Sequence, residues 1–490
     1  MMKDQDTVYR IKPGTRCYFH QDGLRLLSES LNIVKIDPCW LPLFQSLHQG
    51  GALSLSAISN IVSHIDHIKT MQFLDELVFL SFLSKSGNQL MRDFPFVSII
   101  IPVKNRPDEI NACLKSLSLL DYPQERYEII VVDDASTNSL IIDIEEKPFQ
   151  IVRIPHSRGA SYCRNLGAKT AKGEILAFID SDCLSHPEWL TSLIPAFIKP
   201  RVAIVGGYID SYDHKTLLDR YEKKMSSLTM GEDFKRTGIN HSFFYVPTCN
   251  MLVKKDVFLS VGGFNEDLSV GEDVDFCLRI SEQGYDTEYW PMGIVFHKHR
   301  NRLRSFSCRR FDYGTSEPLL FRLHRLMPAK KFILPLWFCF FWIVSLGAVI
   351  SGHLMWLPLT LIGSFLICGY SWLKKTRNIG IPFHVRESLF IYYKVFLKPV
   401  FYIFIFLDRY FLLFIFLLIP FFQWFSILLM AHVVYSACVY YEKRLFPSLS
   451  FSSFLFYFTT DQISYQLGVF WGCIKERSFR VLKPSFGVVS

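Results

Sequence analysis

The middle of the chain carries apolar runs that end in carboxylates. Residues 175–179 are all apolar and are followed by Asp180 and Asp182. An unbroken run of this length predicts a strand that is buried on both faces, as in a parallel sheet covered by helices. Ligands of open α/β sheets bind at the carboxyl ends of such strands, where the two aspartates are expected to lie.

Two earlier runs repeat this pattern. Residues 97–103 predict a first buried strand, and residues 128–132 predict a second one about thirty residues later, the interval typical of a strand–helix–strand unit. The second strand also ends in two carboxylates, Asp133 and Asp134. Gly-x-Gly-x-x-Gly follows neither strand, so the dinucleotide-binding fingerprint is missing. Residues 93–325 are therefore predicted to form an α/β domain.

Residues 1–92 show shorter alternating segments. Separated by Gly and Pro, these segments predict antiparallel strands at residues 8–19, 23–27 and 32–36. Helical spacing follows at residues 40–47, 54–68 and 71–82. Together they predict a small winged-helix-like module. Its layout is similar to the PqqD-like peptide-recognition domain, which implies that a precursor peptide binds at a sheet edge. The alternative is a structural cap on the next domain.

The last third of the chain is strongly apolar. Residues 332–373 contain no Asp, Glu, Lys or Arg, which is long enough for two membrane spans. A second apolar tract, residues 399–441, is interrupted only by Asp408 and Arg409. Basic residues flank the first tract, which places both of its ends in the cytosol. We expect transmembrane helices within residues 326–445 and a cytosolic tail at residues 446–490.

Composition supports this organisation. Half of the 490 residues are hydrophobic, 45 are Phe, and the formal charge of +8 suits a surface that faces membrane lipid better than one that binds nucleic acid. The 12 cysteines form no Cys-x-x-Cys pair, so neither a zinc site nor a disulfide framework is indicated. The N-terminus lacks the apolar core of a signal peptide. The prediction is a multi-pass protein of a bacterial cytoplasmic membrane with its catalytic domain on the cytosolic side.

The aspartates at the end of the third strand suit a divalent cation. Asp180 and Asp182 offer hard oxygen ligands to Mg²⁺ or Mn²⁺, which prefer carboxylates, water and phosphates. By themselves, two aspartates separated by one residue are equally compatible with a polar turn after a strand. The surrounding motifs therefore decide between the two interpretations.

Five short motifs occur in order between residues 97 and 300. They are a strand with Pro102 and Asn105, Val-Val-Asp-Asp-Ala-Ser at 131–136, Arg-Asn-x-Gly at 164–167, Asp-Ser-Asp at 180–182, and Gly-Gly-Phe leading to Glu-Asp at 262–273. Together they resemble the family 2 glycosyltransferases, whose Rossmann-like GT-A fold binds nucleotide-diphosphate sugars. The resemblance implies an inverting hexosyltransferase.

The resemblance implies a role for each donor-side residue. Asp182 would ligate the cation, and Asp180 would touch the ribose or a metal-bound water. Asp134 would accept a hydrogen bond from uracil. Arg164 would hold the carboxylates of the first strands in position. The remaining donor-site residues would be Asp133, Asn105 and Pro102.

The same resemblance implies a catalytic base. Asp273 would deprotonate the acceptor hydroxyl, with Glu272 beside it. Without the family, favourable acidic charge at a helix N-terminus is an equally good explanation of these two residues. His297 and His299 follow at alternate positions of another apolar stretch, and we expect one of them, His299, to bind the cation.

Several arginines precede the first apolar tract. Arg309 and Arg310 suit a clamp for the departing diphosphate, whereas Arg302 and Arg304 suit a basic face that meets anionic lipid.

Two further segments narrow the family. The sequence around residues 309–318 and the tail at residues 461–472 resemble the glycosyltransferases of the mycofactocin system. That implies transfer of glucose from UDP-glucose to a redox cofactor derived from a peptide, the mycofactocin precursor. Gln462 and Gln466 depart from the expected tail pattern, which leaves the role of the tail open.

Two alternatives come from other classes of protein. A processive polysaccharide synthase is disfavoured because the chain lacks Gln-x-x-Arg-Trp. A non-catalytic peptide-binding scaffold is disfavoured because each expected carboxylate is present.

Overall fold

The structure is a computed structural model in which the chain divides into two compact units, residues 1–305 and 306–490. It describes residues 7–20, 22–28, 33–86, 94–138, 140, 149–213, 215–237, 243–324, 331–335, 343–345, 347, 351–353, 355–379, 404–421, 425–483 and 485–489. The four-part division that we predicted at residues 92, 325 and 445 stays a prediction.

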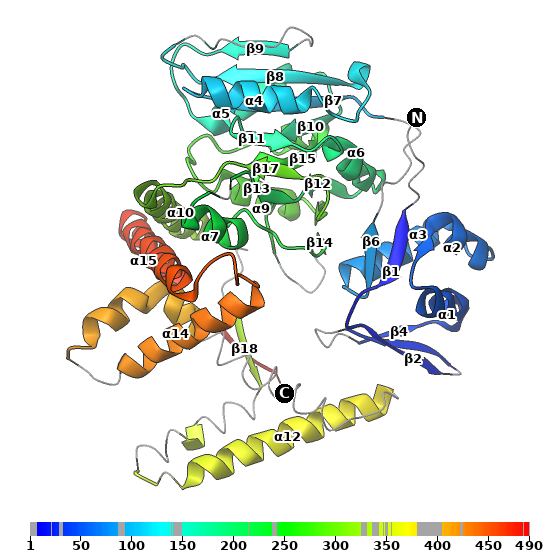
Figure 1. The fold of residues 1–490 in the computed structure, drawn as a ribbon, viewed down its shortest axis with the longest axis vertical. Helices are drawn as coiled ribbons and strands as arrows, with labels where there is room; N and C mark the ends of the chain where they lie inside the picture. Colours follow the sequence, from blue (N-terminus) through cyan, green and yellow to red (C-terminus); the bar gives the residue numbers. More distant parts are fainter. Residues whose placement is uncertain are drawn as a thin grey trace. The chain divides into compact units, whose positions relative to one another are not determined.

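An eight-stranded mixed sheet forms the centre of the first unit (Figure 1). Its order is β14-β16-β12-β15-β10-β7-β8-β9, and β14 and β15 run antiparallel to the other strands. The strands are β7 (Val97–Val103), β8 (Tyr127–Asp133), β9 (Phe149–Arg153), β10 (Ile175–Phe178), β12 (Val202–Gly206), β14 (Lys235–Arg236), β15 (Met251–Lys254) and β16 (Asp286–Tyr289). The three predicted apolar strands are thus confirmed as neighbours, and their carboxyl ends share one edge.

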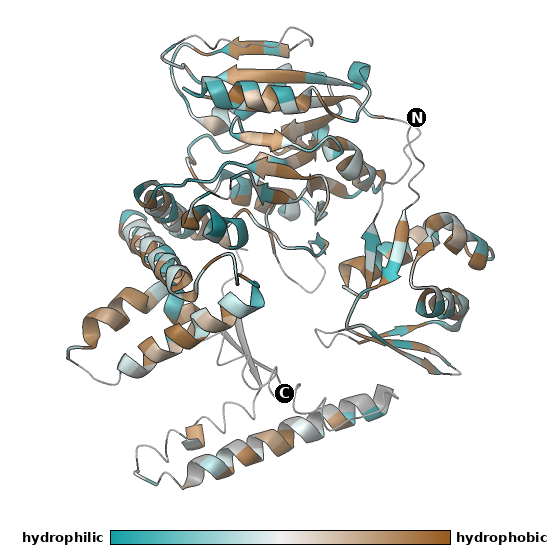
Figure 2. Ribbon diagram, in the orientation of Figure 1, coloured by the Kyte–Doolittle hydropathy of each residue, from teal (hydrophilic) through white to brown (hydrophobic). Residues whose placement is uncertain are grey.

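Helices cover both faces of this sheet. Alternate residues of β7 face opposite sides, so Ile99 packs with α4 (Pro107–Leu117) and Ile100 packs with α5 (Ala160–Thr170) and α9 (Glu272–Glu282). Every residue of β7 is buried, and Figure 2 shows the neighbouring β8 as hydrophobic along most of its length. A Cβ atom at Gly167 of α5 would lie 2.5 Å from Ile100, so glycine allows the close approach of this helix to the sheet. The predicted α/β class of this domain is confirmed.

A small second sheet lies beside the third apolar strand. It has the order β11-β17-β13, with β11 (Cys183–Ser185), β13 (Ile209–Ser211) and β17 (Val295–His297). β11 begins directly after Asp182, and its first residue, Cys183, pairs with His297. This register brings two segments that are far apart in the sequence to the same strand end.

The N-terminal residues form the expected strands and helices. One sheet contains β2 (Arg16–His20), β3 (Gly23–Leu27) and β4 (Ile33–Ile36), and another contains β5 (Leu53–Ser54), β1 (Val8–Ile11) and β6 (Leu83–Ser86). Helices α1 (Leu41–Gly50), α2 (Leu55–Ile61) and α3 (His67–Phe79) complete the module. Tyr9, Leu24, Phe44 and Leu74 are fully buried in a core of its own.

The second unit is mainly helical. It contains α10 (Leu303–Leu323), α12 (Trp356–Ile379), a helix at residues 404–418, α14 (Phe425–Glu442) and α15 (Phe451–Lys475), together with the parallel pair β18 (Lys331–Pro335) and β19 (Ser485–Val489). Glycines bring α10 and α15 into backbone contact. A Cβ atom at Gly314 would overlap the carbonyl oxygen of Tyr465, and one at Gly468 would overlap that of Phe311. These glycines belong to the two segments that resemble the mycofactocin-system enzymes.

The structure does not support the predicted membrane-spanning helices within residues 326–445. Among the residues that the structure describes, no helix combines the length and the apolar character needed to cross a bilayer. Parts of both apolar tracts, including residues 336–342 and 399–403, lie outside the described residues. The multi-pass arrangement and the lipid partner are equally unsupported.

Candidate active site

The polar residues that follow β7, β8 and β10 meet at one edge of the central sheet. Asn105 has a left-handed backbone, with φ of 54°, and links the first two strand ends. Its N–H donates to the Ser136 hydroxyl at 2.9 Å, and its side-chain oxygen accepts from the N–H of Thr137 at 2.7 Å. Pro102 is buried inside β7. This network fixes the loops that follow β7 and β8 against each other.

The two aspartates of β8 are engaged with neighbouring loops. Asp133 accepts a hydrogen bond from the N–H of Ser136 at 3.0 Å. Asp134 accepts from the Ser157 hydroxyl at 2.7 Å and from the N–H groups of Arg158 and Gly159 at 2.7 and 3.2 Å. Asp134 therefore shapes the loop that leads into α5. Its predicted contact with uracil stays a prediction.

Arg164 connects the sheet to helix α9, which corrects its predicted partners. Its guanidinium donates to Asp180 at 2.6 Å and to Glu272 at 3.0 Å, and not to the carboxylates of β8. Arg164 is 3% exposed, and although burial lowers its pKa, Asp180 and then Glu272 raise it more strongly. Burial likewise raises the pKa of Asp180, but Arg164 holds the pKa of that carboxyl below its ordinary value. Asp180 is thus kept ionised beside a permanent cation.

Asp182 lies between a cation and an imidazole. Arg106 donates to its Oδ2 atom, and Nε2 of His297 lies 3.9 Å from its Oδ1 atom. Ligand atoms of Asp182, Cys183 and His297 all lie within 4.8 Å of one another. The Nδ1 atom of His297 is buried and has no hydrogen-bond partner among the described residues. This is the only such metal-type cluster in the described part of the chain.

These residues fit a hard divalent cation in part. The carboxylate of Asp182 and the imidazole of His297 are suitable ligands for Mn²⁺, and a donor diphosphate supplies further oxygens. Burial, then the contact with Cys249, raises the pKa of the Cys183 thiol well above its ordinary value, so Cys183 stays protonated and is a poor ligand. Asp180, the second predicted ligand, is instead paired with Arg164.

The predicted histidine ligand needs correction. His299 does not join the cluster at Asp182; its Nδ1 atom lies 3.7 Å from Glu222. Strand β17 ends at His297, and the ring of His299 lies 4.9 Å from the ring of His297 but contributes no ligand atom to the cluster that includes Asp182. The histidine of the candidate cation cluster is therefore His297.

Asp273 has the properties of a proton acceptor. It lies in the first turn of α9, directly after Glu272, and accepts a hydrogen bond from the N–H of Val274 at 2.8 Å. Burial, followed by the like charge of Glu272, raises the pKa of Asp273 to about 7. A carboxyl that titrates near neutral pH can take and return a proton under physiological conditions.

The family comparison agrees with this geometry. Residues 98–262 match the family described as Glycosyl transferase family 2. The match indicates a domain of the family 2 glycosyltransferase type in this part of the chain. The matched residues contain the strand ends of β7, β8 and β10, and Asp273 and His297 lie beyond them.

Individual relatives of this glycosyltransferase come from bacteria and archaea. The chain is 33% identical over 228 residues to the pre-mycofactocin glycosyltransferase of Mycobacterium tuberculosis, which covers 45% of this chain and 46% of that protein. It is 29% identical over 250 residues to glycosyltransferase AglE of Haloferax volcanii, covering 50% of this chain and 80% of the archaeal protein. The chain thus matches about half the length of the mycobacterial relative.

A solved structure with some likeness is the mannosyltransferase PcManGT of Pyrobaculum calidifontis in complex with GDP-Man and Mn²⁺. The sequence identity is 18% and the TM-score is 0.37, over 52% of this chain and 70% of that one.

Sequence reasoning missed two residues of this glycosyltransferase site. Arg106 follows Asn105 directly, and nothing in its surroundings distinguishes it from a surface arginine. Asn165, next to Arg164, holds the turn before α9: its amide donates to the carbonyl of Phe264 at 2.8 Å and accepts from the N–H of the same residue at 2.8 Å. The Arg-Asn pair of the motif is the signal that was available.

The predicted diphosphate clamp lies in the second unit. Arg310 is buried and forms an ion pair with Asp461 at 3.3 Å, and the Arg309 guanidinium lies 4.7 Å from the ring centre of Tyr313. Both side chains therefore have partners within their own unit, and their contact with the donor stays a prediction.

Proposed function

We propose that the protein is an inverting glycosyltransferase that transfers glucose from UDP-glucose to a peptide-derived acceptor of the mycofactocin type. The observation that carries this proposal is the bridge formed by Arg164. It ties Asp180, beside the candidate cation ligands, to Glu272, whose neighbour Asp273 has a pKa of about 7. A carboxylate beside the cation site and a proton acceptor are thus held around a common buried guanidinium.

Each group has a task in this reaction. A divalent cation at Asp182 and His297 would neutralise the charge that develops on the leaving diphosphate. Asp273 takes the proton of the acceptor hydroxyl, whose oxygen forms the new bond to the anomeric carbon. The bond from that carbon to the diphosphate oxygen breaks, and the diphosphate leaves with the electron pair. Arg164 keeps Asp180 ionised, whereas Asp273, with a pKa of about 7, can change its charge near neutral pH.

The N-terminal module packs against the catalytic domain. One ion pair joins it to the catalytic domain: Asp75 binds Lys199 at 2.8 Å. Each partner has a second contact in its own part, Asp75 with Lys85 at 3.3 Å and Lys199 with Glu288 at 3.3 Å. The rings of Phe79 and Phe234 meet edge to face at the same junction. Removing one partner of a desolvated ion pair is destabilising. We therefore expect the module to stay packed against the catalytic domain.

A cavity at this junction could receive the acceptor. It measures about 380 Å³, which lies within the range of small-molecule sites. Leu83, Ser84 and Lys85 of strand β6 line one side, and Tyr208 and Met292 are among the residues that line the other. Tyr208 follows the carboxyl end of β12, at the same sheet edge as the aspartates. Ile294, also in the lining, comes directly before strand β17, which ends at His297.

The direct test of this proposal is a transfer assay. The full-length protein is incubated with labelled UDP-glucose, Mn²⁺ and the peptide-derived precursor, and products are identified by mass spectrometry. A hexose added to the precursor supports the proposal. Hexose transfer from other sugar nucleotides but not from UDP-glucose contradicts the donor, and donor hydrolysis without transfer contradicts the acceptor.

A cavity-filling variant tests the acceptor site. Ser84→Trp should slow transfer to the acceptor by at least about tenfold, while the slow hydrolysis of UDP-glucose stays at the wild-type rate. Ser86→Trp on the same strand is the matched control, because residue 86 is exposed and does not line the cavity. Equal transfer rates of the two variants would show that the acceptor does not bind in this cavity.

A further inference from the structure

Arg106 occupies one of the two carboxylate oxygens of Asp182, the candidate cation ligand. Its guanidinium donates to Oδ2 of Asp182, while Oδ1 of the same carboxylate faces His297. A divalent cation binds carboxylate oxygens at about 2.0–2.2 Å, so it would stand directly beside the guanidinium. Two cations on one carboxylate repel each other, and they are therefore competitors for Asp182.

The backbone around Arg106 is held firmly, whereas its side chain is accessible. Asn105 is fastened to Ser136 and Thr137 as described above, and Pro107 fixes the first turn of α4. The Arg106 side chain is nonetheless 40% exposed, compared with 15% for that of Asp182. Because the guanidinium reaches solvent, water can replace the carboxylate as its partner, so this ion pair costs less to open than a fully buried one.

The departing guanidinium would find a suitable new partner in the donor. A planar guanidinium binds phosphate oxygens through two parallel hydrogen bonds, and the donor diphosphate would share the cation bound at Asp182. The side chain would then need only to rotate about a fixed backbone position. Lys104, two residues earlier, contacts Ser157 at 2.7 Å and lies 4.0 Å from Asp134, whereas Arg106 is the residue of this loop that contacts Asp182.

We propose that Arg106 is an exchangeable counterion. It neutralises Asp182 while the cation site is empty, and it moves to the donor diphosphate when the cation and the donor bind together. This inference rests on the proposed function, because it requires a diphosphate donor. Its consequence is coupling: the cation binds weakly alone and tightly with the nucleotide, since only the nucleotide gives Arg106 an alternative partner.

The test measures Mn²⁺ binding by the full-length protein, by electron paramagnetic resonance of free Mn²⁺, with and without UDP. For Arg106→Met we expect Mn²⁺ alone to bind roughly two- to tenfold more tightly than to the wild type. We also expect UDP to enhance Mn²⁺ binding at least about threefold less than in the wild type. Arg106→Lys, which keeps the charge, should lie close to the wild type in both measurements.

Arg201→Met is the matched control for net charge. Arg201 is 75% exposed and pairs with Asp286 at the opposite end of β12, so its loss should leave Mn²⁺ binding unchanged. Arg106→Gln serves as a second uncharged variant if Arg106→Met does not reach the wild-type melting temperature. Unchanged or weaker Mn²⁺ binding by the uncharged variants, or undiminished enhancement by UDP, overturns the inference. Absence of Mn²⁺ and UDP binding in the wild type instead overturns the proposed function itself, and the inference with it.

Discussion

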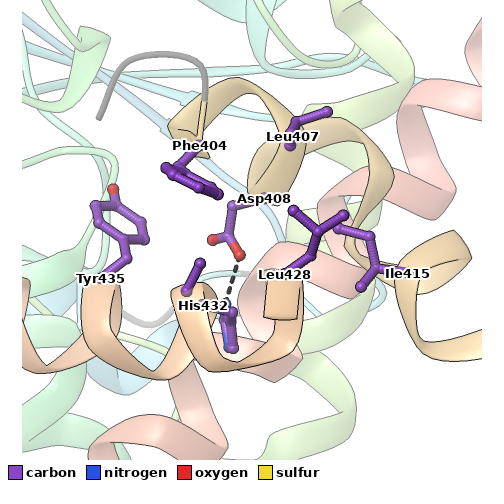
Figure 3. A pocket seen from close by; sticks show the side chains of 8 residues that line it. Phe404, Leu407, Asp408, Ile415, Leu428, His432 and Tyr435 are labelled. Atoms are coloured by element: carbon purple, nitrogen blue, oxygen red, sulfur yellow. Dashed lines mark hydrogen bonds and ion pairs between the residues drawn. The ribbon is translucent and has the colours of Figure 1, made fainter. Parts of the chain in front are cut away.

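Buried charges occur in both units, but they are arranged differently. In the first unit, Asp180, Asp182 and Glu272 come from strand ends and a helix N-terminus, and their side chains are 28%, 15% and 15% exposed. In the second unit, Asp408 and His432 form a pair whose side chains are only 6% and 3% exposed. Figure 3 shows them facing each other between Phe404, Leu428 and Tyr435. His432 also contacts the hydroxyl of Thr459 at 2.9 Å, so one pair joins three helices.

Glu317 and Arg409 of the second unit also connect neighbouring helices. Glu317 of α10 accepts hydrogen bonds from Tyr410 at 2.8 Å and from Tyr465 at 2.5 Å. The Arg409 guanidinium lies 3.4 Å from the ring centre of Tyr465. Charges on the sides of packed helices thus link those helices, whereas charges at strand ends stay accessible to a ligand. We infer that the charges at the strand ends take part in the chemistry, whereas those between the helices stabilise the second unit. The following predictions test this difference.

The largest effect is expected at the cation ligand. Asp182→Asn should lower the transfer rate by about a thousandfold or more, because several kcal/mol of charge stabilisation at the diphosphate are lost. The melting temperature should change little, since the Asp182 side chain retains contact with solvent. Initial rates with and without excess chelator, together with thermal unfolding, provide the measurement. Full activity of this variant, or of the wild type in chelator, would exclude cation-dependent transfer.

The next effect concerns the proton acceptor. Asp273→Asn should reduce turnover by roughly 10²–10⁴-fold while calorimetric affinity for UDP stays within a few-fold of the wild type, because a general base acts on the rate and not on donor binding. Glu272→Gln should be milder. If Asp273 only provides favourable charge at the N-terminus of α9, both variants lose some stability and neither loses more than a few-fold in rate.

A smaller effect should appear in the pH profile. Asp273 must be ionised to accept a proton, and its pKa is about 7, so the transfer rate should fall as the pH drops below about 7. Glu272→Gln removes the like charge that raises this pKa and should shift the acidic limb to lower pH. Initial rates measured from about pH 5 to about pH 9, a range that spans both ordinary carboxyl and histidine titration, check the direction. A shift to higher pH would assign the limb to another group.

The smallest effect on catalysis is expected in the second unit. His432→Leu leaves Asp408 buried without its partner and should lower the free energy of unfolding of that unit by about 3 kcal/mol. Replacing both residues by leucine should recover much of that loss, because two apolar groups leave no buried charge unpaired. The donor hydrolysis rate of the folded protein should not change. A large loss of hydrolysis with an unchanged melting temperature would show that this pair also has a chemical role.

The sequence predicted the strands better than the contacts between them. The runs at residues 97–103, 129–132 and 175–179 are almost entirely apolar because these strands are covered on both faces, and that property is local. The aspartates at the strand ends were found for the same reason. The choice between His297 and His299 depends on the pairing of Cys183 with His297, a register between segments far apart in the chain that no local pattern records.

The partners of Arg164 were missed for a related reason. Its position on α5 is clear from the motif, but its reach to Glu272 depends on how α9 packs against the same sheet face. Arg106 was overlooked because a lone exposed arginine carries no periodic signal. The partners of side chains that join distant elements thus depend on tertiary packing. The family resemblance indicated such residues only where they lie within its motifs.

The glycines between α10 and α15 decide where the chain can be cut. A protein shortened to residue 325 would keep Gly314 but lose Gly468 and Gly472, whose backbones cover the same stretch of α10. Loss of α15 would expose Phe321 of α10, which is buried against Val469 and Cys473 in the intact unit. A protein that ends at residue 302 lacks both helices, so this apolar surface is not exposed. A catalytic fragment for crystallisation should therefore end before α10, and removal of the tail alone should cause aggregation.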